Sequence, residues 1–154
     1  MSASRYELVR HLHPAIAAVL SAGLAFLAWA APAPPNPCKL ATVAEIEQIL
    51  GKLKEPPKVT DEGATCTYAP AKGQGFLDVT LHDADLAALK KRNGGKNAVA
   101  VPEFGSGAFV TPDFENFAEL YAKKGNLVLR VSVPKGPEAV EVVKAVARKA
   151  LPRL

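Results

Sequence analysis

The stretch "NFAELYAKKGNLVLRVSVP", residues 116–134, decides the fold of this chain. Two apolar runs, 117–122 and 127–133, flank the Gly-containing turn "KKGN". Side chains of the second run alternate between two faces: Leu127, Leu129, Val131 and Val133 on one, and Val128, Arg130 and Ser132 on the other. Alternation on both sides of a glycine turn predicts an antiparallel β-hairpin with one buried face.

A second hairpin is predicted further upstream. The segments "TCTYAP", residues 65–70, and "FLDVTLH", residues 76–82, are separated by the turn "AKGQG". In the second segment every other residue is apolar, which predicts one buried and one polar face. Residues 98–114 contain two further short apolar runs around a Gly-Ser-Gly turn, so they predict one or two more strands.

Three amphipathic helices are predicted around these hairpins. Thr42 and Glu45 form a capping box at the start of a helix over residues 43–50. Asp83 is expected to cap a second helix, "ADLAALKKRN". Pro137 is expected to open the last helix, whose apolar stripe is formed by Val140, Val143, Ala147 and Leu151. The apolar face of the first helix is expected to contain Val43, Ile46, Ile49 and Leu50.

The order of these elements predicts the fold class. It runs helix, strand, strand, helix, strand, strand with room for one more, and helix. Hairpins without long crossovers imply an antiparallel sheet, and amphipathic helices must cover its apolar face. We therefore expect a two-layer α+β domain with an antiparallel sheet, helices packed on one face, and one disulfide.

Residues 1–30 have the pattern of a secretory signal peptide. Arg5 and Arg10 precede an uncharged apolar run over residues 15–31, and the tripeptide Ala-Trp-Ala ends at Ala30. The alternative is an uncleaved anchor formed by residues 15–31, because this run approaches the roughly 20 residues that cross a bilayer.

The rest of the chain is expected to lie outside the cytoplasm. Residues 31–37, "APAPPNP", predict a Pro-rich extended linker. Residues 38–154 are predicted to form a single exported domain, periplasmic or secreted. It would be attached to a membrane only if the N-terminal segment stays uncleaved.

Cys38 and Cys66 are the two cysteines of the chain. In an exported protein an even pair favours a structural disulfide. Asn36 and Pro37 before the first cysteine argue against lipidation, and the spacing is not that of a redox C-x-x-C pair. His82 is the single histidine beyond the predicted signal, which leaves too few ligands for a zinc site.

Several short motifs together resemble a family of small exported domains of unknown function, many of them lipoproteins and mainly actinobacterial. The matching segments, within about residues 36–154, are "PCKLATVAEIEQILG", "CTYAP", "FGSGAF", "LYAKKGNLVLRVSV" and "AVARKAL". Their layout is also similar to the extracellular sensor domain of a mycobacterial serine/threonine kinase. The resemblance implies a Cys38–Cys66 disulfide and a sensor-like α+β fold, and it brings no catalytic residues. The chain departs from the family in lacking a lipobox, and "FGSGAF" lacks an acidic residue often found there.

The functional expectation is a non-enzymatic domain that binds a small ligand or a cell-envelope partner. The net charge of +4 is mild. The sequence has no basic cluster with interleaved aromatics, which is the pattern that would predict nucleic-acid binding. No cofactor and no metal are expected. Arg130 lies on the polar side of the strongest strand, and with Lys123, Lys124 and Lys135 it would form a weak anionic site. The competing interpretation is a charged, solvent-facing row that prevents edge aggregation.

Two other functions stay open at this point. His82 would titrate near neutral pH, and either His82 or Ser106 would serve as the reactive residue of a small extracytoplasmic hydrolase. Ser106 lacks the G-x-S-x-G elbow of such enzymes, and a solvated or turn role explains both residues. The second alternative is a structural envelope or assembly protein.

Overall fold

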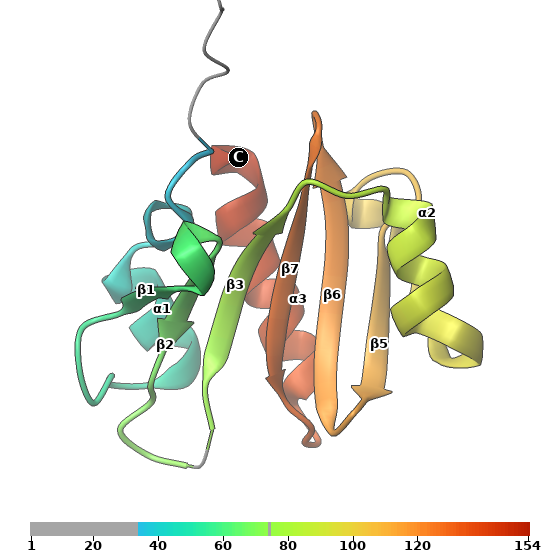
Figure 1. The fold of residues 1–154 in the computed structure, drawn as a ribbon. Helices are drawn as coiled ribbons and strands as arrows, with labels where there is room; N and C mark the ends of the chain where they lie inside the picture. Colours follow the sequence, from blue (N-terminus) through green and yellow to red (C-terminus); the bar gives the residue numbers. More distant parts are fainter. Residues whose placement is uncertain (1–33, 74) are drawn as a thin grey trace, which may run out of the picture. The chain divides into compact units, whose positions relative to one another are not determined.

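One antiparallel sheet organises the part of the chain that the computed structural model describes, residues 34–73 and 75–154 (Figure 1). Within these residues, seven strands lie in the order β1-β2-β3-β7-β6-β5-β4. Their bounds are β1 Lys58–Thr60, β2 Thr65–Tyr68, β3 Leu77–His82, β4 Val99–Ala100, β5 Phe109–Phe114, β6 Phe117–Lys124 and β7 Leu127–Pro134. The predicted α+β class with an antiparallel sheet is confirmed, and the predicted signal peptide lies outside the described residues.

Helix α1, Val43–Leu50, begins at the predicted capping box. The Thr42 hydroxyl accepts a hydrogen bond from the Glu45 backbone N–H at 3.3 Å, and the Glu45 carboxylate accepts one from the Thr42 N–H at 2.9 Å. Gly51, with φ of 78°, ends the helix in a conformation that favours glycine. Val43 is 43% exposed, contrary to the prediction, because the buried stripe starts one turn later at Ile46.

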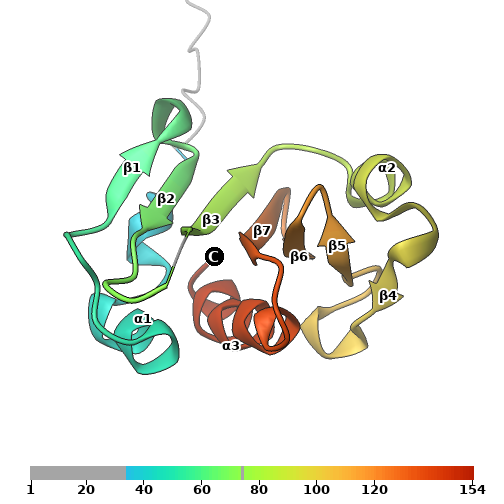
Figure 2. The ribbon, with the colours of Figure 1, turned by 90° about the horizontal axis from the view of Figure 1, so that it is seen from below.

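Helix α3, Ala139–Ala150, packs with α1 against the same face of the sheet (Figure 2). It begins two residues after the expected Pro137. Its fully buried side chains are Val143, Val146, Ala147 and Ala150, so the stripe is shifted slightly from the predicted one. The facing side chains of the sheet are the predicted apolar sets of β3 and β7, except Leu127, together with residues of β2, β5 and β6.

Helix α2, Leu86–Leu89, lies on the opposite face of the sheet (Figure 2). Its two leucines pack against Phe109, Tyr121 and Val128, which point away from α1 and α3. The helix is capped by the side chain of Asp85, which accepts from the Ala88 N–H at 2.8 Å, so the predicted cap at Asp83 is wrong. The chain continues as a π-helical turn, Lys90–Gly94.

Strand β1 is an edge strand in a segment for which the sequence predicts no strand. All three of its residues are exposed, so it has no alternation of buried and polar residues to reveal it. It is held by antiparallel pairing with β2.

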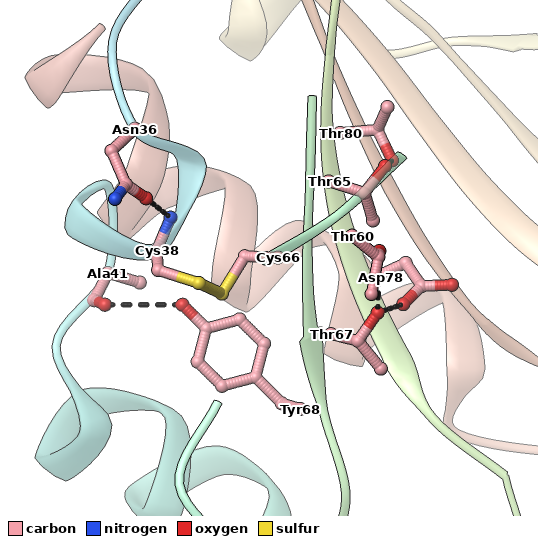
Figure 3. The surroundings of a disulfide bond; sticks show 10 residues. All are labelled: Asn36, Cys38, Ala41, Thr60, Thr65, Cys66, Thr67, Tyr68, Asp78 and Thr80. Atoms are coloured by element: carbon pink, nitrogen blue, oxygen red, sulfur yellow. Dashed lines mark hydrogen bonds between the residues drawn. A yellow bond between two sulfur atoms is a disulfide. The ribbon is translucent and has the colours of Figure 1, made fainter. Parts of the chain in front are cut away.

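The disulfide between Cys38 and Cys66 joins the 3₁₀ turn Pro37–Lys39 to β2 (Figure 3). The predicted pairing is confirmed, and the two Cα atoms are 5.0 Å apart. Next to it, the Tyr68 hydroxyl donates to the Ala41 carbonyl at 3.3 Å. A disulfide is consistent with an extracytoplasmic location. Among the described residues, none of the helices has the length and apolar character needed to cross a membrane.

Candidate functional site

The sheet face opposite α1 and α3 carries two rows of polar side chains. Strand register places Asp78 beside Ser132 and Ser132 beside Glu119, on β3, β7 and β6. The neighbouring row contains Thr80 and Arg130 on β3 and β7. On this face, helix α2 packs against Phe109, Tyr121 and Val128, none of which belongs to the two rows. Figure 1 shows the helix beside β5, at the other side of the sheet from β3.

Side chains of β2 form hydrogen bonds with Asp78 and Thr80, the β3 members of the two rows. The Thr67 hydroxyl donates to Asp78 Oδ1 at 2.7 Å, and the hydroxyls of Thr65 and Thr80 are 3.0 Å apart. Figure 3 shows these four side chains on the side of the strands away from the disulfide and Tyr68. Asp78 has no ion-pair partner among the residues that the structure describes. It therefore keeps a half-buried carboxylate oxygen for another donor.

Glu119 is a buried carboxylate held at the β6 end of the first row. Its Oε2 accepts a hydrogen bond from the Tyr121 hydroxyl at 2.6 Å, and that hydroxyl accepts one from Asn93 Nδ2 at 2.7 Å. Burial, followed by the hydrogen bond to Glu119, raises the pKa of Tyr121. Tyr121 therefore remains a protonated donor to Glu119 across the range in which proteins are stable.

Arg130 approaches Glu119 without a close hydrogen bond. Its Nη1 lies 3.7 Å from Glu119 Oε1, and 27% of its side chain is exposed. Its Nε is buried and has no hydrogen-bond partner in the described chain. The guanidinium thus keeps most of its donors unused.

A cleft of about 200 Å³ opens beside these groups, and we call it the polar cleft. Its lining residues are Asp78, Phe114, Glu115, Phe117, Glu119, Arg130 and Ser132. The β5–β6 turn forms its rim, where Glu115 and Asn116 have φ of 52° and 72°. This left-handed pair is typical of a tight hairpin turn, and it brings the rings of Phe114 and Phe117 to opposite positions in the ladder.

Ser132 lines the polar cleft and is only 5% exposed. Among the side-chain atoms of the cleft's lining residues, Arg130 Nε is the one that is both buried and without a partner in the described chain. More than nine in ten buried polar groups in native proteins have a partner. The unpaired arginine nitrogen therefore indicates room for an external acceptor.

The structure does not gather the four cations of the predicted anionic site. Lys124 points to the other face of the sheet, where its Nζ donates to the Leu151 and Pro152 carbonyls at 3.1 and 2.7 Å. Lys123 borders a separate hollow beside α2, and Lys135 is paired with Asp113. Of the predicted set, Arg130 alone lines the polar cleft.

His82 lies two residues along β3 from Thr80, outside the lining of the polar cleft. Its pKa is lowered by burial first, and then by the positive charges of Arg130 and Arg92. Its buried Nε2 has no hydrogen-bond partner among residues 34–73 and 75–154. Ser106 borders the hollow beside α2. Because His82 Nε2 has no hydrogen bond to Ser106, the two residues do not form a nucleophile–base pair.

Sequence reasoning missed Asp78, Glu119 and Ser132 as members of one site. The alternation of β3 and β7 placed Asp78 and Ser132 on the polar face, but only the strand register brings them next to each other. Glu119 lies in a run of buried residues on β6, and the sequence of that run does not indicate which side chains lie next to Glu119. In the described part of the chain, no group of three or more His, Cys, Asp and Glu side chains could hold a metal ion.

Four larger hollows lie elsewhere on the described surface and have mainly apolar walls. One of about 330 Å³ is bordered by Leu50, Phe76 and Val142, and one of about 440 Å³ by Val59 and Leu81. The other two, of about 370 and 290 Å³, lie beside α3 and α2. None of the four is lined by a residue with a buried, unpaired polar atom among the described residues. Because binding sites combine apolar walls with converging polar groups, the polar cleft is the better candidate.

In comparisons with known proteins, no protein-family model, no curated protein and no solved structure matches this chain. The resemblance to exported sensor-like domains thus stays a prediction.

Proposed function

We propose that residues 38–154 form a non-enzymatic, extracytoplasmic domain with a sensor-like role, which binds a small ligand in the polar cleft. The observation that carries the proposal is Arg130, a three-quarters buried guanidinium with a single long contact to Glu119 and an unpaired Nε. A buried charged group without hydrogen bonds is destabilising, so its retention is explained if a ligand completes its contacts.

The size of the cleft supports a small molecule over a macromolecule. Its volume of about 200 Å³ is below the range of roughly 300–1,000 Å³ typical of drug-sized sites. The disulfide and the predicted signal peptide support action outside the cytoplasm.

A fragment titration of the oxidised full chain, followed by heteronuclear NMR, tests the proposal. We expect fragments that bind to shift the resonances of Ser132, Arg130 and Phe117 together. Arg130→Met should abolish these shifts, whereas Lys149→Met on α3 should leave them unchanged. Fragments that collect only beside Phe76, or that ignore the Arg130 substitution, would contradict the proposal.

A further inference from the structure

The guanidinium of Arg130 lacks the acceptors that it needs within the described chain. Its Nε is buried and has no hydrogen-bond partner among the described residues, and its Nη1 lies 3.7 Å from Glu119 Oε1. That separation is longer than the roughly 3.2 Å at which an ordinary hydrogen bond from nitrogen to oxygen ends. A ligand for this guanidinium must therefore carry a hydrogen-bond acceptor.

The charge of the polar cleft decides which kind of acceptor fits. Three carboxylates line it, those of Asp78, Glu115 and Glu119, against the single guanidinium of Arg130. Glu119 is the carboxylate near the guanidinium, and among the described residues neither Asp78 nor Glu115 has an ion-pair partner. An anionic acceptor would be repelled by these two carboxylates, and this repulsion is stronger beside a protein than in bulk water. An uncharged acceptor avoids it.

The carbonyl oxygen of an amide meets both conditions. It is uncharged, and its two lone pairs can accept from the N–H groups of a guanidinium. Hydrogen bonds from a charged donor are shorter and stronger than those between neutral groups. The N–H groups of the same amide are donors, so they tolerate a neighbouring carboxylate that would repel the second oxygen of an anion.

The apolar wall of the cleft suits a ligand with a ring. Phe114 and Phe117 are paired where β5 and β6 meet, and Phe117 is 40% exposed. Aromatic rings pack well against one another, and each buries a large apolar area. The cleft holds about 200 Å³, and one water molecule takes up roughly 30 Å³ in the liquid. Its size therefore matches a compact molecule.

We infer that the polar cleft recognises a small uncharged amide, whose carbonyl oxygen accepts from the Arg130 guanidinium and whose apolar part packs against Phe114 and Phe117. This inference rests on the proposed function and names the ligand class of the same site.

Three molecules of nearly the same size and shape test the ligand class: benzamide, benzoate and benzamidine. The first has an uncharged acceptor, the second is an anion, and the third is a cation without an acceptor. Each is titrated into the oxidised full chain near neutral pH and followed by NMR. We expect benzamide to shift the resonances of Arg130 and Phe117 and to bind about tenfold or more tightly than benzamidine, which is the effect of one hydrogen bond to a charged group. Benzoate should bind at least about threefold more weakly than benzamide, because two carboxylates of the cleft lack a cation.

Three substitutions and a control attribute these differences to the cleft. Arg130→Met should remove the shifts that benzamide causes. Glu115→Gln removes one negative charge from an exposed turn residue, so it should raise the affinity for benzoate relative to benzamide about threefold. Asp78→Asn keeps an oxygen for the Thr67 hydroxyl and should raise the same ratio. Glu141→Gln, on α3 at the opposite face, is the matched control and should leave the ratio unchanged.

Equal or tighter binding of benzoate or benzamidine in the polar cleft would overturn the amide class and leave the proposed function standing. A ratio of benzoate to benzamide affinity that ignores both Glu115→Gln and Asp78→Asn would also overturn it, because the charge of the cleft would then not select the ligand. If benzamide shifts no resonance of the cleft, the inference fails, and the fragment titration with Arg130→Met decides the proposed function separately.

Discussion

A buried carboxylate such as Glu119 is tolerated because its neighbours satisfy it. Removing a carboxylate from water costs several kcal/mol unless hydrogen bonds or a counter-charge replace the lost hydration. Tyr121 supplies a bond of 2.6 Å to one oxygen, and Arg130 supplies a positive charge 3.7 Å from the other. The Tyr121 ring also stacks on Phe109 with 4.7 Å between ring centroids, which fixes the hydroxyl in place.

We predict that Tyr121→Phe lowers the free energy of unfolding by about 2 kcal/mol, because it removes a donor to a buried charge. Tyr68→Phe is the matched control, since its hydroxyl donates to a neutral carbonyl at 3.3 Å, and it should lose about 1 kcal/mol or less. Urea denaturation of the three proteins measures both values. Equal losses in the free energy of unfolding for the two variants would show that the hydrogen bond from Tyr121 to Glu119 stabilises the protein no more than one to a neutral carbonyl.

At the scale of single residues, the sequence predicted side-chain faces better than it predicted neighbours. The alternation along β7 correctly placed Arg130 and Ser132 opposite the buried face. The neighbours of Ser132 depend on the register of three strands, which hydrophobic alternation alone leaves open. Lys124, which the sequence analysis places with Arg130 in one anionic site, lies on the other face of the sheet, where its Nζ donates to the Pro152 carbonyl.

At the scale of elements, α2 is held by a small apolar cluster of its own. Leu89 is 3% exposed and packs with Leu86 against Phe109, Tyr121 and Val128. We predict that Leu89→Ala costs about 2–4 kcal/mol, because the residue leaves a cavity that a short helix cannot close. Ala87→Ser, on the exposed side of the same helix, should stay within about 0.5 kcal/mol. Thermal and urea unfolding distinguish the two, and similar small effects would mean that α2 is not anchored through Leu89.

The C-terminal turn Leu151–Arg153 is tied to α1 by an ion pair. Arg153 donates to both oxygens of Glu45 at 2.7 and 2.9 Å, and also to the Leu40 carbonyl at 3.0 Å. The bond from Arg153, together with the backbone N–H of Thr42, lowers the pKa of Glu45 from 4.5 to about 2.

A lowered carboxylate pKa gives stability that is present above the ordinary value and lost as the pH falls. We therefore predict that Glu45→Gln is less stable than the native protein above pH 4.5, and that the difference disappears as the pH approaches 2. Unfolding measured at a series of pH values checks this. A difference that is independent of pH would show that the charge of Glu45 is not involved.

The elements that sequence reasoning missed or shifted have local causes. Strand β1 is three exposed residues at a sheet edge, so it lacks the alternation that marked β3 and β7. Asp83 and Asp85 are equivalent as caps by residue type, and only the bond from Ala88 distinguishes them. Helix α2 was expected beside the other helices, because its apolar pattern does not specify which face of the sheet it covers.

At the scale of the whole molecule, the disulfide fixes the N-terminal turn to the sheet. Cys66 is fully buried on β2, at a sequence separation of 28 from Cys38. Closing a loop of this length stabilises the folded state by roughly 3.5 kcal/mol in the chain-entropy description. We predict a loss close to that value on reduction, measured as the shift in urea-unfolding free energy with and without dithiothreitol. A stability that does not respond to the reductant would contradict this role.

The central claim is that the polar cleft binds a small ligand through Arg130. A crystal structure of the oxidised protein with a fragment that shifts the Arg130 resonances tests it most directly. We expect an acceptor atom of the fragment within about 3 Å of a nitrogen of the Arg130 guanidinium. A fragment seated instead in the apolar hollow beside Phe76, or a polar cleft left empty at a saturating concentration of the fragment, would contradict it.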